Sequence, residues 1–327
     1  MTGKQTFGAS KVLYYLRVFR LLDYVLVLTI GVGIIFIAKG IKPYCRSFSW
    51  DDPTISYPYK KSTFPGWSLV LFNFLPCLFF VVAEALRAAL APEGKWYLDA
   101  CEPEIVPEVV ATPVDAANNE SETHKPDEFS DQDQGPGVRT PCGKRGRWKV
   151  VLEVVNYWIL VQALSVLLAF DSVELMKLYA GQLRPDFLSR VKFEGYTNSS
   201  KNVDWCSVAK KGRLSFPSGH SSCAFSTMTP VAFYLFGMLR AFSGASLWRS
   251  FIALAPISLA FVVAISRTRD NRHHFYDIIA GSLIGLGSAI FAVFLLFRFT
   301  KEKGLLIPRR LELVQCNGGR LIAEPVP

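Results

Sequence analysis

Three short segments of the chain carry residue types that can bind a phosphate group. The first contains Lys177 and Arg184, the second is "PSGH" at positions 217–220, and the third, "SRTRDNRHHFYD" at positions 266–277, contains Arg267. Three positive charges suit a phosphate dianion, and an arginine can donate two parallel hydrogen bonds to it. These cations predict an anion-binding site, provided that the fold brings the three segments together.

The segment "PSGH" supplies uncharged groups for such a site. Pro217 suits the first turn of a helix, and Gly219 permits a close approach of the backbone. The free N–H groups at the start of a helix point at an anion, and the hydroxyl of Ser218 can donate to it as well. We therefore expect a helix to begin here and to face the cations with its N-terminus.

His273 and Asp277 have the spacing of a nucleophile and the carboxylate that orients it. They are four residues apart, so on a helix they would share one face, with one ring nitrogen held by the carboxylate and the other free to attack phosphorus. His220 could protonate the departing oxygen and later activate water. Asp270 and His274 are also four residues apart, so spacing alone leaves two candidate pairs.

The first two cations also predict a local structure. Lys177 and Arg184 are seven residues apart, so on a helix they would lie on one face, two turns from each other. Pro185 would end that helix. Positions 177–184 are therefore expected to be helical.

Long apolar helices are the elements that must position these segments. Half of the 327 residues are hydrophobic, and they gather in blocks that approach the ~20 residues needed to cross a hydrocarbon core. None of the blocks alternates as the strands of a membrane barrel do. We expect an all-α integral membrane protein with six transmembrane helices, at Leu22–Ala38, Trp67–Leu86, Val150–Phe170, Ser222–Leu239, Phe251–Ile265 and Asp277–Phe297.

One long polar segment separates the second and third apolar blocks. Positions 98–138 contain 11 acidic residues, one lysine and five prolines, a composition that buries too little apolar surface to fold by itself. We expect a disordered cytosolic loop inserted into a single membrane domain that spans residues 1–327. The basic residues of the chain are spread over separate loops, which argues against nucleic acid as a partner.

The basic residues of the loops set the expected orientation. With six crossings, the side that holds both termini carries 19 basic residues outside the acidic loop, and the opposite side carries 16. By the positive-inside rule the N- and C-termini are cytosolic. The three polar segments then meet at the lumenal or extracellular face. Asn198 of "NSS" would be open to glycosylation there, whereas Asn119 of "NES" would be cytosolic and unused.

Two smaller features bear on packing. Cys45 and Cys206 would both lie on the lumenal side, where a disulfide is permitted, but the sequence leaves open whether they are bridged. Gly281 and Gly285 in "GSLIG" have the spacing that lets two helix backbones approach closely. We expect them to pack helices within the bundle. The alternative use of this spacing is a contact between two copies of the chain.

In spacing and order, the three segments resemble the signature of the type 2 phosphatidic acid phosphatases, also called lipid phosphate phosphatases, which share their site with vanadium haloperoxidases. The chain matches KxxxxxxRP at 177–185, PSGH at 217–220 and SRxxxxxHxxxD at 266–277. "KLYAGQLRPDF" and "ISRTRDNRHHFYD" are most similar to the fungal-type diacylglycerol pyrophosphate phosphatases. The long acidic insertion departs from the shorter loop of that family.

The resemblance implies a haloperoxidase-like helical core, no metal or other cofactor, and a role for each matched residue. His273 would be the nucleophile, oriented by Asp277, and His220 the general acid. The resemblance therefore favours His273 over His274 as the nucleophile. The residues implied to bind the phosphate group are Lys177, Arg184, Ser218, Gly219 and Arg267.

The expected activity is the hydrolysis of lipid phosphates through a phosphohistidine. Phosphatidic acid, lysophosphatidic acid and diacylglycerol pyrophosphate are the expected substrates, because a site at the headgroup level can take a phosphate while the acyl chains stay in hydrocarbon. Polyprenyl pyrophosphates and sphingoid phosphates would meet the same face. A receptor or transporter that binds an anionic lipid without turnover is the alternative from another class, but it would need neither a His–Asp pair nor a second histidine.

Overall fold

A computed structural model of the chain describes residues 16, 19–91, 101–103, 142–144, 147–241, 247–300, 305–309, 316–317 and 320–321. The acidic segment expected at 98–138 lies outside the described residues except for Cys101–Pro103. The chain divides into two compact units. The first comprises Met1–Leu90 and Val151–Leu311, and the second comprises Ala91–Val150 and Glu312–Pro327.

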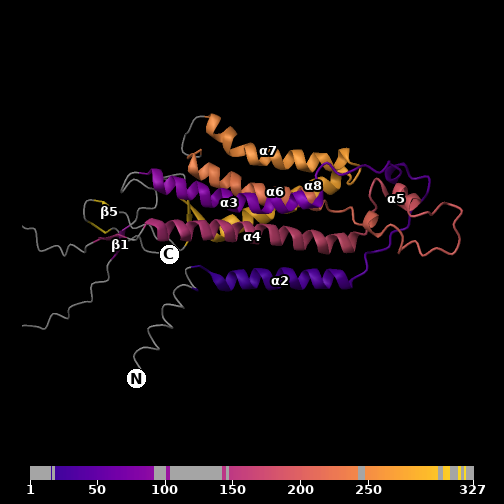
Figure 1. The fold of residues 1–327 in the computed structure, drawn as a ribbon, viewed down its shortest axis with the longest axis horizontal. Coiled ribbons are helices and arrows are strands. Elements are labelled where there is room, and N and C mark those ends of the chain that lie inside the picture. Colours follow the sequence, from indigo (N-terminus) through magenta and orange to yellow (C-terminus); the bar gives the residue numbers. More distant parts are fainter. Residues whose placement is uncertain are drawn as a thin grey trace, which may run out of the picture. The chain divides into compact units, whose positions relative to one another are not determined.

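Long helices build the first unit, and each of the six expected apolar blocks is helical (Figure 1). They are α2 (Leu21–Gly40), α3 (Gly66–Leu90), α4 (Arg147–Ala180, in this unit from Val151 on), α6 (Gly219–Met238), α7 (Leu247–Arg269) and α8 (Phe275–Leu296). A short helix, α5 (Phe187–Phe193), and two 3₁₀ turns, η1 (Pro53–Ile55) and η2 (Lys210–Arg213), lie in the connections.

Among the described helices, five are long and apolar enough to cross a membrane, namely α2, α3, α4, α7 and α8. Of α2 only Gly31 is buried, so its apolar side chains face outward, as contact with lipid requires. Helix α6 differs because its buried face carries hydroxyl side chains, among them Ser222, Ser226 and Thr229, and α3, α7 and α8 pack around it. The helical prediction for this block is confirmed, while its crossing of the membrane stays a prediction.

Close backbone packing joins α6 to α8. A side chain at Gly281 would collide with the carbonyl oxygen of Ser218, and one at Gly285 would collide with the carbonyl oxygen of Ser222. The prediction that "GSLIG" packs helices within the bundle is confirmed. This face of α8 is already occupied by α6 and is not free for a second copy of the chain.

Short hairpins qualify the all-α expectation. The sixth apolar block was expected to continue to Phe297, but α8 ends at Leu296 and β3 (Phe297–Thr300) pairs antiparallel with β4 (Leu305–Pro308). The segment "FRFT" alternates apolar and polar residues, which is the pattern of a strand. In the second unit, β1 (Cys101–Pro103) pairs with β2 (Cys142–Lys144), and β5 (Cys316–Asn317) with β6 (Arg320–Leu321).

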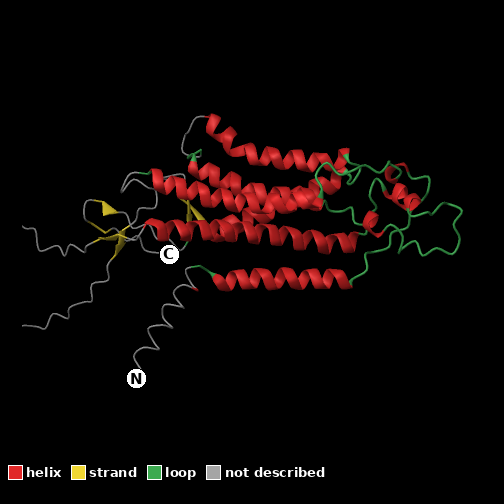
Figure 2. Cartoon of the chain, viewed as in Figure 1, coloured by secondary structure: helices red, strands yellow, loops and turns green. Residues whose placement is uncertain are grey.

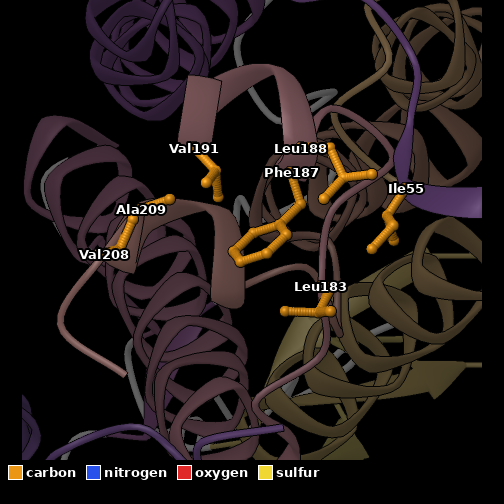
Figure 3. Close-up of a cluster of buried hydrophobic side chains, with 7 residues drawn as sticks. All are labelled: Ile55, Leu183, Phe187, Leu188, Val191, Val208 and Ala209. Atoms are coloured by element: carbon orange, nitrogen blue, oxygen red, sulfur yellow. The ribbon is translucent and has the colours of Figure 1, made fainter. Parts of the chain in front are cut away.

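The three connections that carry or adjoin the motifs gather at one end of the long helices of the first unit (Figure 2). They are residues 41–65, 181–218 and 270–274. A small apolar core holds the first two together (Figure 3), formed by Ile55, Leu183, Phe187, Leu188, Val191, Val208 and Ala209. A disulfide between Cys45 and Cys206 ties the same two connections, so the bridge that the sequence left open is formed.

Candidate active site

His273 lies among the motif residues, and its two ring nitrogens differ in protonation. The side chain is 4% exposed, and Nδ1 is 2.8 Å from the carbonyl oxygen of Ser215. A carbonyl oxygen only accepts, so Nδ1 carries the proton and Nε2 of the neutral ring has the free electron pair. Burial lowers the pKa of His273 to about 4, and the nearby Asp277 carboxylate opposes this shift. The ring is therefore neutral near pH 7.

The expected His273–Asp277 pair is close, but its geometry differs from the prediction. Helix α8 begins at Phe275, so His273 precedes the helix and the two residues do not share a helix face. Oδ2 of Asp277 is 3.7 Å from Nδ1 of His273, too far for a hydrogen bond, and accepts from the Ser215 hydroxyl at 2.5 Å. Ser215 thus contacts both members of the pair.

The second motif begins α6 as expected. Ser218 is the N-cap residue, and its hydroxyl oxygen accepts from Ser221, so the hydroxyl proton is left for another acceptor. A side chain at Gly219 would lie 3.1 Å from Nζ of Lys177, which places the ammonium group beside the helix N-terminus. Within the described part of the chain, the buried Nε2 of His220 has no hydrogen-bond partner.

The predicted helix through Lys177 and Arg184 is wrong. Helix α4 ends at Ala180, because Gly181 has a φ of 53° and a side chain there would collide with the carbonyl oxygen of Tyr44. Lys177 stays on the last turn of α4, while Arg184 lies in the following connection. The charges of both residues nevertheless act on His273 and lower its pKa.

These two cations have different surroundings. Lys177 is paired with Glu174 at 2.5 Å. Arg184 donates to the carbonyl oxygen of Leu214 at 3.3 Å, and its Nε is buried without a partner among the described residues. Burial lowers the pKa of Arg184 to about 10, which leaves the side chain charged at neutral pH. Arg184 is thus a desolvated cation with an unused donor.

Arg267 is fixed by the first connection. It is 1% exposed and donates to the hydroxyl of Ser62 at 2.8 Å, to the carbonyl oxygen of Phe64 at 3.1 Å and to Asp270 at 2.9 Å. Thr63 donates to both carboxylate oxygens of Asp270. Asp270 therefore does not pair with His274, and the alternative His–Asp couple is not formed.

The predicted site residues come together in one electrostatic cluster. The charges of Arg267 and Arg184 act on His220, and those of Arg184 and Lys177 act on His273. Asn198 lies apart from them, exposed in the same connection as Arg184. The sequence interpretation did not identify four residues that hold the cluster in place: Ser62, Thr63, Phe64 and Ser215. Only the position of Ser215, two residues before "PSGH", could have pointed to one of them.

Comparison with known proteins agrees with this geometry. Residues 157–301 match the PAP2 superfamily, and this range contains every predicted catalytic and phosphate-binding residue. The resemblance inferred from the three motifs is thereby confirmed. No solved structure matches the chain.

Several curated proteins are similar in sequence to this chain. A PA-phosphatase related-family protein of Dictyostelium discoideum is 36% identical over 50% of this chain and 58% of its own length. Diacylglycerol pyrophosphate phosphatase 1 of Saccharomyces cerevisiae is 40% identical over 34% of this chain and 41% of its own length. Phospholipid phosphatase 2 of Rattus norvegicus is 26% identical over 88% of both chains. The chain thus spans about half the length of the first two relatives.

Proposed function

We propose that the chain is a membrane-embedded phosphatase that removes the terminal phosphate from lipid phosphates through a phosphohistidine at His273. The main support for the proposal is the hydrogen bond that fixes the tautomer of His273. Nδ1 of His273 donates to the Ser215 carbonyl, which leaves Nε2 of this buried ring unprotonated under the influence of the Arg184 and Lys177 charges. The PAP2 region and the names of the relatives support the same reaction.

The proposed reaction has two steps. Nε2 of His273 attacks phosphorus, the bond between phosphorus and the lipid oxygen breaks, and His220 gives a proton to the departing oxygen. His220 then takes a proton from water, whose oxygen displaces the histidine and releases inorganic phosphate. Five residues would hold the phosphate oxygens throughout: Lys177, Arg184, Ser218, Gly219 and Arg267. Asp277, close to Nδ1, would stabilise the positive charge that develops on the ring of His273.

The proposed setting is a membrane surface. We place α6 as a sixth crossing, both termini in the cytosol and the site on the lumenal or extracellular face. The haloperoxidase-like core belongs to this proposal as well. Phosphatidic acid, lysophosphatidic acid and diacylglycerol pyrophosphate are the proposed substrates, since a site at helix ends can take their headgroups without extracting the acyl chains.

Phosphate release from phosphatidic acid and from diacylglycerol pyrophosphate in detergent micelles tests the proposal. The proposed steps use side chains alone, so we expect turnover in excess EDTA. His273→Ala should abolish turnover and still bind vanadate, whereas His274→Ala should retain measurable turnover. If the wild-type chain binds both lipids and hydrolyses neither, the chain is a lipid-binding protein and the proposal is wrong.

A further inference from the structure

The second histidine of the third motif, His274, has no part in the proposed reaction but is the N-cap residue of α8, and two of its hydrogen bonds have a defined direction. Its Nε2 is 3.1 Å from the carbonyl oxygen of Leu183. Its backbone N–H donates to Oδ2 of Asp277 at 2.9 Å. Because a carbonyl oxygen only accepts, the proton of His274 lies on Nε2, the opposite nitrogen from that of His273. His274 is thus a hydrogen-bond donor at both contacts.

The contact with Leu183 acts on Arg184 through a single peptide unit. The carbonyl of Leu183 and the N–H of Arg184 belong to the same planar group. His274 holds the oxygen of this group, and the carbonyl oxygen of Gly212 accepts from its N–H at 2.8 Å. With both ends bonded, the peptide plane cannot rotate, so the direction in which the Arg184 side chain leaves the backbone is fixed.

The ring of His274 is itself held in place by Tyr276. The two rings are stacked, with centroids 5.1 Å apart and planes 6° from parallel. The hydroxyl of Tyr276 accepts from Nε2 of Gln182 at 2.9 Å, one residue before Leu183. The start of α8 therefore contacts two successive residues before Arg184, the side chain of Gln182 and the backbone carbonyl of Leu183. The N–H of Ser215 also donates to the carbonyl oxygen of Gln182.

We propose that His274 is a positioning residue that fixes Arg184 and Asp277 relative to each other. It connects the half-buried guanidinium of Arg184, whose Nε has no partner among the described residues, to the carboxylate beside the nucleophile. The inference rests on the proposed function, because Arg184 matters to catalysis only if phosphate binds there. In this assignment His274 touches neither the substrate nor the reacting atoms.

A double-mutant cycle in the full-length protein tests the proposal. We expect His274→Ala to raise the dissociation constant of vanadate and to lower kcat/KM, each by about tenfold, the order of one lost hydrogen bond. In an Arg184→Ala background, His274→Ala should change either quantity by less than about twofold, because the effect passes through Arg184. Equal losses in both backgrounds would overturn the proposal.

Two further variants separate positioning from general destabilisation. His274→Gln keeps an N–H donor at a reach similar to that of Nε2, so it should recover most of the vanadate affinity. Arg269→Ala removes an exposed charge of the same segment and should leave the affinity unchanged. If His274→Ala does not fold, His274→Gln compared with His274→Leu provides the same test, and equal affinity of those two variants contradicts the proposal.

Vanadate binding is measured directly, by the shift of the unfolding temperature, so it does not depend on turnover. A wild-type chain that binds vanadate but hydrolyses no lipid would contradict the proposed function. The double-mutant cycle would still test the role of His274 through vanadate binding. Complete loss of turnover in His274→Ala with unchanged vanadate affinity would make His274 a catalytic residue and would also overturn the proposal.

Discussion

The direction of one hydrogen bond determines which nitrogen of His273 is available for chemistry. The Ser215 carbonyl holds the proton on Nδ1, and burial keeps the ring from taking a second proton at Nε2. Asp277 also uses Oδ2 for Ser215, and its buried Oδ1 has no partner among the described residues.

NMR of the histidine rings tests the tautomer and the pKa assigned to His273. The chain has four histidines, so selective labelling of this residue type gives few signals, and His273→Asn assigns one of them. The pKa of His273 is lowered from its ordinary value of 6.5 to about 4, so the ring should stay neutral at pH 5, protonated at Nδ1. A titration midpoint near 6.5, or a neutral ring protonated at Nε2, would contradict the assignment.

The chemistry of the site was predictable from sequence because it depends on residue types that are rare in apolar surroundings. The cations and the histidines of the motifs were identified in this way, and the structure brings them into one cluster. Ser215 and the segment Ser62–Phe64 were missed for a physical reason. They act through backbone carbonyls and common hydroxyls, and their partners lie 58 to 207 residues away in the chain.

Among the elements, the apolar blocks predicted the helices but not their ends. The residues at 177–184 were expected to be helical, yet the close approach of Tyr44 to Gly181 ends α4 before Arg184. In the same way, the capping arrangement of His274 with Asp277 starts α8 after His273. Such helix ends depend on contacts with other segments of the chain. These contacts cannot be read from the sequence of the helix itself.

Substitution of two glycines in α8 tests whether the packing of α6 on α8 holds the site. Gly281→Ala places a methyl group against the Ser218 carbonyl, so the helices must separate, at about 1–3 kcal/mol of stability. Because Ser218 caps α6 within the site, we expect kcat to fall by about 100-fold for a shift of about 1 Å. Thermal unfolding and phosphate release measure the two effects.

Gly287→Ala is the matched control on the same helix, because a methyl group there meets no atom within 4 Å. It should leave turnover unchanged and raise stability slightly, by up to about 1 kcal/mol, since alanine favours a helix more than glycine does. Similar losses for both variants would mean that α8 is sensitive to any substitution and that its contact with α6 does not position Ser218.

Across the whole molecule, the orientation in the membrane is open to a glycosylation test. Asn198 is exposed in the connection that also carries Arg184 and the second motif. If this connection is lumenal, expression with microsomes should add one glycan that Asn198→Gln removes, whereas Asn119→Gln should leave it in place. A glycan on Asn119 instead would invert the proposed orientation and place the site in the cytosol.

The disulfide between Cys45 and Cys206 bears on both the proposed lumenal location and the stability of the site. It joins the connection that carries Ser62 and Phe64, which bind Arg267, to the connection that carries Arg184. Cysteines pair in the lumen and stay reduced in the cytosol, so a formed bridge agrees with a lumenal site. Breaking it should free the first connection to leave Arg267 and should weaken phosphate binding.

We therefore expect Cys45→Ser and Cys206→Ser each to lower the unfolding free energy by about 2–5 kcal/mol and to raise KM. A reducing agent should have the same effect on the wild-type chain and none on either variant. Cys77→Ser, at a free cysteine of α3, should respond to the reducing agent as the wild type does. Turnover and stability that do not respond to reduction would show that the apolar core around Phe187 and the contacts of Arg267 hold the two connections without the bridge.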